Sequence, residues 1–186
     1  CDFINNTAAL NGGGVNYRET PQNITFNGNF INNTSPRGGG VNFFESFENV
    51  IFNGEFTANS AINGGAIAAV EGIIKDVSFK DNHAENAGAI YFVKSGYIIN
   101  CNFTNNSATG VYGSGGAIRM VLGNVTNCNF TNNKGTGDGG SAGGAISMHS
   151  GNVTNCNFTG NSAQFGGAIE SYGFANVIDC NFIGNN

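Results

Sequence analysis

Eight copies of one short motif, Phe-x-x-Asn, run through the whole sequence at intervals of 23 to 28 residues. The motif phenylalanines are Phe3, Phe30, Phe56, Phe79, Phe103, Phe130, Phe158 and Phe182. A repeat of this length with a slightly variable period is typical of a solenoid, in which each coil packs on its neighbours and tolerates insertions in its turns. The repeat therefore predicts one elongated domain over residues 1–186, with function carried by columns of side chains.

Two stretches of each repeat have the pattern of β-strands. Apolar and polar residues alternate in Cys-Asn-Phe-Thr, which places Cys128 and Phe130 on one inner face. The second stretch is Gly-Gly-Ala-Ile or a variant, and its copies end at Val15, Val41, Ile67, Ile90, Ile118, Ile146 and Ile169. Gly-rich insertions at 109–114 and 135–141 predict two extended turns. We expect an all-β fold, a right-handed parallel β-helix of about seven to eight coils of roughly 25 residues, its hand following the general crossover rule.

A tight corner is expected directly after each Phe strand. The second residue after Phe is Asn, Asp or Gly in seven copies and Ala58 in one, and the first three types tolerate left-handed backbone angles. The next residue is Asn in every copy. Stacked coils lie about 4.8 Å apart, so these amides can hydrogen-bond along the stack. The sequence therefore predicts an asparagine ladder.

Composition and charge exclude some classes of partner. Only 10% of the residues are charged, and seven Lys and Arg against a net charge of -5 are too few for a nucleic-acid surface. No stretch reaches the roughly 18 apolar residues that a membrane-spanning helix requires. Both ends fall within the repeat, without the atypical capping units of natural solenoids. We therefore expect a fragment of a longer surface protein whose membrane anchor lies outside these residues.

The five cysteines fall in one column, two residues before the motif Phe. Three coils carry Gly28, Gly54 and Val77 at this position, so the site requires a small apolar residue. We predict a buried column of free thiols, which behave as small hydrophobic groups. The alternative is a disulfide between stacked neighbours such as Cys128 and Cys156, whose Cα atoms would lie near the required distance.

The residues that follow the second motif are unexpectedly apolar for an outward face. Alternation places an aromatic or aliphatic side chain there in most coils, namely Phe44, Val70, Tyr91, Val93, Val121 and Tyr172. A contiguous exposed apolar patch often marks an interaction site, so these six residues are the candidate ligand-binding residues. The alternative is that the segment 43–47 folds over this face, or that the third residue turns inward at a corner.

Glu19, Glu45 and Glu71 each lie four residues after the motif Val or Ile. If the coils are in register, the three carboxylates form one line, which gives a candidate calcium site. The alternative is a solvated edge of loops that do not align, because the first two coils have connections three residues longer. No other cofactor is expected, and His83 and His149 fall in different columns.

The sequence CNFTNNSA at residues 101–108, followed by GGAI at 115–118, resembles the repeats of adhesin-like surface proteins of methanogenic archaea. Through GGAI and Phe-x-x-Asn it is also similar to the passenger repeats of chlamydial polymorphic outer-membrane proteins. The resemblance implies a right-handed β-helical surface protein that mediates adhesion. It also implies an extracellular, cell-surface location and a partner on the surface of another cell, either protein or glycan.

The function expected is therefore that of a non-enzymatic adhesion module that projects from a cell surface. Two alternatives remain open at this point. One is a carbohydrate-active enzyme on the same fold, which would require clustered acidic residues. The other is a purely structural stalk whose binding function lies elsewhere.

Overall fold

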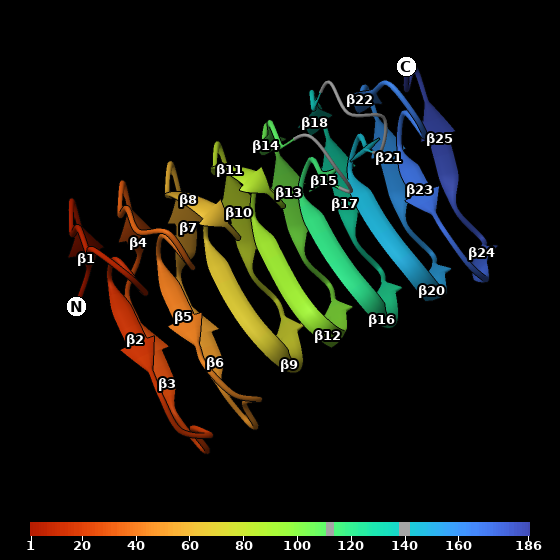
Figure 1. Cartoon of the computed structure of the whole chain (residues 1–186). Coiled ribbons are helices and arrows are strands. Elements are labelled where there is room, and N and C mark those ends of the chain that lie inside the picture. The colour runs from red at the N-terminus through yellow and green to blue at the C-terminus, as the bar shows by residue number, and fades with distance from the viewer. Residues whose placement is uncertain (111–113, 138–141) are drawn as a thin grey trace.

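The repeat forms parallel sheets in which each coil lies beside the next, and the N- and C-termini lie at opposite ends of the stack (Figure 1). The computed structural model describes residues 1–110, 114–137 and 142–186, so the predicted extended turns at 109–114 and 135–141 lie partly outside it. Regular structure in the described part is entirely β-strand, and none of these residues forms a helix long and apolar enough to cross a membrane. The all-β parallel solenoid is confirmed, with about seven turns; its right-handed sense stays a prediction.

The motif phenylalanines stack in one eight-stranded parallel sheet, here called the Phe sheet. Its strands are β1 (Phe3–Ile4), β4 (Phe30–Ile31), β7 (Glu55–Thr57), β10 (Ser78–Lys80), β13 (Asn102–Thr104), β17 (Asn129–Thr131), β21 (Asn157–Thr159) and β25 (Asn181–Ile183). The register places Phe103 beside Phe130, and successive rings stack with centroids 4.6–5.2 Å apart. This offset stack fills one side of the interior and fixes the register of the coils.

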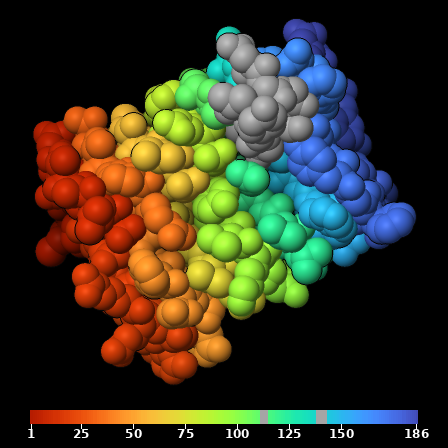
Figure 2. Space-filling view, in the orientation of Figure 1, coloured from red at the N-terminus to blue at the C-terminus, as the bar shows by residue number. Residues whose placement is uncertain are grey.

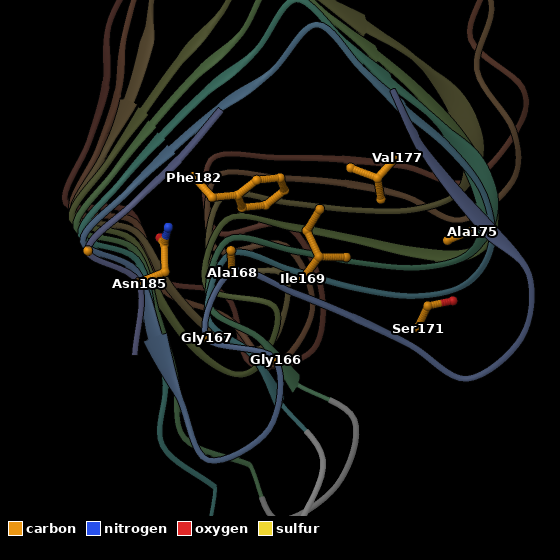
Figure 3. Close-up of a pocket in the computed structure, with 10 residues that line it drawn as sticks. Gly166, Gly167, Ala168, Ile169, Ser171, Ala175, Val177, Phe182 and Asn185 are labelled. Carbon is orange, nitrogen blue, oxygen red and sulfur yellow. The ribbon is translucent and has the colours of Figure 1, made fainter. Parts of the chain in front are cut away.

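The second motif begins a sheet of longer strands, here called the long sheet. Its strands are β2 (Val15–Tyr17), β5 (Val41–Phe43), β9 (Ile67–Lys75), β12 (Ile90–Ile99), β16 (Ile118–Thr126), β20 (Ile146–Thr154) and β23 (Ile169–Ser171), with β24 (Ala175–Ile178) beside β20. Within it, Ile67, Ile90, Ile118 and Ile146 are in register and fully buried. In Figure 3, Phe182, Ile169 and Val177 of the last coil point into the space that the coil encloses, a hollow of about 650 Å³.

Shorter strands close each coil between the two main sheets. One sheet contains β8 (Ser60–Asn63), β11 (His83–Asn86), β14 (Ser107–Ala108), β18 (Lys134–Gly135) and β22 (Ser162–Ala163). Two pairs, β15 (Ser114–Gly115) with β19 (Ala142–Gly143) and β3 (Thr25–Asn27) with β6 (Ile51–Asn53), form separate two-stranded sheets. The β3–β6 pair lies outside the long sheet because the first two coils leave it after β2 and β5, through the connections 18–24 and 44–50.

The corners have the left-handed backbone that the sequence predicts. The residue before each ladder asparagine has a φ of 52–64°, including Ala58 at 54° and Gly160 at 64°. A second left-handed corner, which was not predicted, directly precedes the Phe strand in the last five coils, at Asp76, Asn100, Asn127, Asn155 and Asp179. In the first two coils the left-handed residues Asn23 and Asn49 precede β3 and β6 instead. The same residue types occur at both corners because Asn, Asp and Gly are the residues that adopt this conformation most readily.

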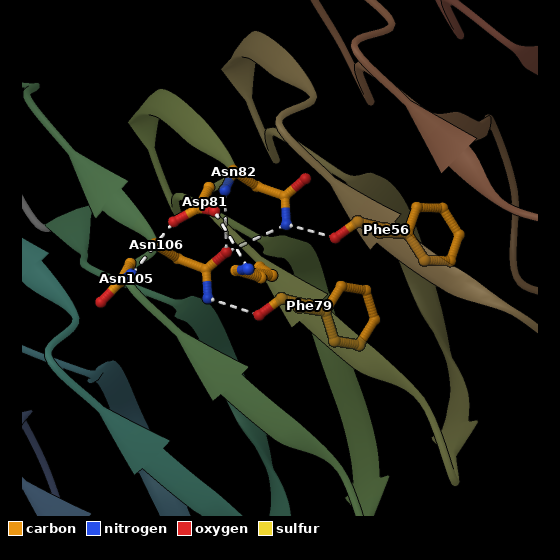
Figure 4. Close-up of polar contacts among 7 residues, drawn as sticks. Phe56, Phe79, Asp81, Asn82, Asn105 and Asn106 are labelled. Carbon is orange, nitrogen blue, oxygen red and sulfur yellow. Dashed lines mark hydrogen bonds and ion pairs between the residues drawn. The ribbon is translucent and has the colours of Figure 1, made fainter. Parts of the chain in front are cut away.

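The predicted asparagine ladder is present (Figure 4). From Asn6 to Asn161, each ladder amide donates to the side-chain oxygen of the next asparagine at 2.9–3.0 Å. From Asn33 onward, each also donates to the carbonyl of a motif Phe in the preceding coil, as Asn106 does to Phe79 at 3.0 Å. The six central members, from Asn33 to Asn161, are fully buried. Buried amides satisfied in this way hold the corner together, because each would be costly without its partners.

The cysteine column consists of free thiols, as predicted. Cys101, Cys128 and Cys156 are buried, Cys180 is partly exposed and Cys1 is exposed. The backbone N–H of Cys128 donates to Cys156 Sγ at 3.4 Å, and Cys128 Sγ donates to the Thr126 carbonyl at 3.2 Å. The hydrogen bond with Cys101 and burial together raise the pKa of Cys128 to about 12. The same contact lowers the pKa of Cys101, so only Cys128 of this pair is held more firmly in the protonated form, while both thiols fill the core as small groups.

Candidate functional site

The six candidate ligand-binding residues lie along the outer side of the long sheet, and we call them the apolar face. Phe44 follows β5, and Tyr172 follows β23. The exposed fractions are 48% for Phe44, 38% for Val93, 46% for Val121 and 50% for Tyr172, while Val70 and Tyr91 are half-buried. The face therefore remains open to solvent along most of the stack.

Alternation along the strands explains the apolar face. The register pairs Ala68 with Tyr91 and Tyr91 with Arg119, so these first outward positions form one column. The second outward position holds Val70, Val93 and Val121. The ladder continues past β5, because the N–H of Phe44 donates to the Tyr17 carbonyl at 2.8 Å.

Two arginines partly cover two of the three aromatic members of the apolar face, Phe44 and Tyr91. The Arg37 guanidinium lies 5.9 Å from the centroid of the Phe44 ring, and the Arg119 guanidinium lies 5.5 Å from that of Tyr91. Arg119 also donates to Asn86 Oδ1 at 3.2 Å. A cation over a ring face is attracted by the ring quadrupole, so each arginine restricts its aromatic partner.

Neither alternative reading of this face describes it fully. Within the segment 43–47, Phe43 and Phe47 point into the core with exposed fractions of 0% and 3%, while Phe44 remains outside. The segment therefore does not cover the apolar face. Some of the first outward positions are not accessible to solvent, however. Ala68 is fully buried, because the turn at Gly64 packs against the start of β9. A Cβ on Gly64 would lie 3.2 Å from the backbone nitrogen of Ala68.

Sequence reasoning missed three exposed apolar residues on the same strands. Ile73, Tyr97 and Leu122 have exposed fractions of 51%, 48% and 51%. Ile73 and Tyr97 lie in register on β9 and β12, beyond Gly72 and Gly96. Extending the alternation past these glycines, in Ile73-Ile74-Lys75 for example, would have identified the outward positions.

The three glutamates of the calcium hypothesis are not brought together as a metal site. Glu71 lies in β9, and its carboxylate accepts a hydrogen bond from the Ser95 hydroxyl at 3.0 Å. Its carbonyl accepts from the N–H of Phe47, so the neighbouring coil presents Phe47 to Glu71. Glu19 and Glu45 lie in the exposed connections 18–24 and 44–50. In the described part of the chain, no three His, Cys, Asp or Glu residues are grouped closely enough to hold a metal ion.

The two histidines and Glu170 each make a separate side-chain contact. His83 Nδ1 is 2.8 Å from Ser107 Oγ, and His149 Nδ1 is 2.9 Å from Ser150 Oγ; both histidines are exposed. Burial raises the pKa of Glu170, although the Tyr172 hydroxyl donates to its carboxylate at 2.9 Å. These contacts stabilise individual side chains.

One repeat of the chain is similar to a known family. Residues 100–119, which include Cys101, Phe103 and the GGAI sequence, match the model of the Chlamydia polymorphic membrane protein repeat. No curated protein and no solved structure shows significant similarity to the chain. The matched repeat and the β-solenoid fit a surface or outer-membrane protein. The resemblance to adhesin-like proteins of methanogenic archaea stays a prediction.

Proposed function

We propose that this chain is a non-enzymatic adhesion module of an extracellular, cell-surface protein, attaching it to protein or glycan on another cell. The observation that supports this proposal best is the apolar face. Its exposed side chains repeat along a sheet whose position is fixed by the Phe stack and the asparagine ladder. An exposed apolar row on an ordered surface is typical of an interaction site.

The rigidity of the solenoid supports attachment as well. Buried amides and stacked rings hold neighbouring coils in register, so little conformational entropy is lost when the apolar face is covered. Parallel coils also present the same kind of side chain at regular spacing, which suits a partner that is itself repetitive.

Attachment is tested with beads coated with the 186-residue chain and a panel of bacterial, archaeal and epithelial cells, counted by flow cytometry. We expect the double variant Phe44→Ala with Val121→Ala to reduce attachment by about tenfold, as loss of buried apolar anchors does in other interfaces. The matched control is Ile62→Ala, an aliphatic residue with 44% exposure on β8. Equal attachment of the double variant and the parent would contradict the proposal, as would a parent that attaches to none of the cells.

A further inference from the structure

The connection between β5 and β6 forms a wall at the step between the second and third coils. The wall consists of residues 44–50. In the third coil β9 continues without such a connection, and the distance along the chain from the second motif to the next motif Phe is three residues shorter there than in the second coil. Phe47 anchors the wall in the core, where its ring centroid lies 4.4 Å from that of Phe43. Gly72 leaves space for this ring, since a Cβ there would lie 2.4 Å from it. Figure 2 shows the first two coils projecting beyond the later ones on this side.

Backbone contacts with the first coil hold the wall in place. The N–H of Glu48 donates to the Pro21 carbonyl at 3.1 Å, and the N–H of Asn23 donates to the Glu48 carbonyl at 3.3 Å. Pro21 and Val50 are buried. Within the described part of the chain, the Glu48 carboxylate accepts one long hydrogen bond, from Gln22 at 3.5 Å, and it is exposed to solvent on a backbone that these contacts fix.

The opposite side consists of two adjacent strands of the long sheet. Glu71 and Ile73 of β9 lie in register with Ser95 and Tyr97 of β12. The Ser95 hydroxyl donates to Glu71 Oε2 at 3.0 Å, which orients that carboxylate. Ile73 and Tyr97 have about half of their surface exposed although they flank a hollow.

The wall and the two strands border a cleft of about 380 Å³ that is open to solvent. Phe47 and Gly72 line its base, and the other lining residues are Ser46, Glu48, Glu71, Ile73, Ser95 and Tyr97. A second hollow of about 360 Å³ continues on the other side of Ile73, between Ile51 and Lys75. Ligand clefts have volumes of about 300–1,000 Å³ and combine apolar surface with a few convergent polar groups.

We propose that this cleft binds one ring of an uncharged sugar. The ring of Tyr97 and the side chain of Ile73 offer an apolar surface to the C–H face of a pyranose. Carboxylates on opposite sides, Glu48 and Glu71, accept hydrogen bonds from sugar hydroxyls, and such O–H···O⁻ bonds are among the strong ones. The same two carboxylates repel an acidic sugar.

The cleft differs from the apolar face in position and chemistry. The sugar-binding proposal refines the proposed attachment function, because it assigns a glycan to one binding site. It rests on that function only for the biological role of the cleft. Binding of free sugar in solution tests the cleft, whereas bead attachment to cells tests the function. Attachment without sugar binding would overturn the cleft alone.

Saturation-transfer NMR with the 186-residue chain tests the cleft. The probes are methyl β-D-glucoside, methyl β-D-galactoside, methyl α-D-mannoside, N-acetylglucosamine and glucuronate. We expect transfer to at least one of the four uncharged sugars and none to glucuronate. The Tyr97→Ala and Glu71→Gln variants should each weaken binding by about tenfold, the effect of one aromatic contact or one charged hydrogen bond.

Phe165→Ala is the matched control, because Phe165 is an aromatic residue with 47% exposure that lies outside both the cleft and the apolar face. It should bind sugar as the parent does, and the circular-dichroism spectra of all variants should show that they remain folded. The cleft assignment is refuted if no uncharged sugar receives transfer, if glucuronate binds as well as the others, or if the two cleft variants retain the parent's affinity.

Discussion

Replacing Asn106 with alanine removes the centre of the buried asparagine ladder. Asn106 is fully buried, and its side chain makes four hydrogen bonds. It donates to the Phe79 carbonyl and to Asn133 Oδ1 at 3.0 Å each. Its own oxygen accepts from the backbone N–H and the side-chain amide of Asn82, at 3.1 and 3.0 Å.

The expected loss follows from the partners that remain behind. Asn82 keeps its side-chain bond to Phe56, and Asn133 keeps its bond from the backbone of residue 106. The backbone N–H of Asn82 and the carbonyl of Phe79 each lose their hydrogen bond to the Asn106 side chain, and both groups are buried. At about 1–3 kcal/mol for each such group, the free energy of unfolding should fall by about 2–6 kcal/mol.

Asn129→Ala is the control, since Asn129 belongs to an exposed ladder with Asn102 and Asn157 at 2.9 Å. Water replaces those bonds, so the loss should remain below about 1 kcal/mol. Urea unfolding followed by far-ultraviolet circular dichroism measures both variants. The reasoning fails if the buried variant loses no more stability than the exposed one.

Three further predictions concern packing, ionisation and backbone strain. Gly72→Ala should lower the free energy of unfolding by about 1–3 kcal/mol because its Cβ would meet the Phe47 ring, and a parent-like melting temperature would contradict this. The pKa of Cys128 is raised from 9.0 to about 12, so the folded chain holds this proton more tightly than the unfolded chain and stability should fall as the pH rises from about 9 towards 12. Urea unfolding across that range should show a smaller fall for Cys128→Val, and an unchanged slope would count against the assignment. Ala58 has a φ of 54°, so Ala58→Asn should raise the free energy of unfolding by about 1 kcal/mol, while Ala61→Asn in strand β8 should not; urea midpoints compare the two.

Much of the fold could be predicted because the spacing of the repeated motifs gives the register between neighbouring coils. The interval between Phe103 and Phe130 equals one coil, and alternation on either side assigns the inner and outer faces. The left-handed corner and the ladder followed from residue type alone. The left-handed corner at Asn100 and Asn127 was not predicted, although the same Asn and Asp pattern directly precedes the cysteine column.

The candidate site was predicted less completely. Alternation located Val93 and Val121 correctly on an exposed face, but it gave no indication that arginines lie over Phe44 and Tyr91. It also placed Glu71 in line with Glu45, whereas the longer connection brings Phe47 beside Glu71. An insertion of three residues in one coil changes which residues of two neighbouring coils lie side by side after it. The sequence alone does not show where the backbone accommodates the extra residues.

Period, alternation and corner chemistry are local properties, so the amino-acid sequence by itself determined the parallel β-solenoid, the Phe stack, the asparagine ladder and the column of thiols. Tertiary structure alone decided that Phe47 turns inward over Gly72 and that Glu48 then faces Glu71 and Tyr97 across a cleft. The physical reason is that a cleft depends on how two unequal coils pack against each other. That packing is set by the space left at one glycine and by hydrogen bonds between residues more than 20 positions apart.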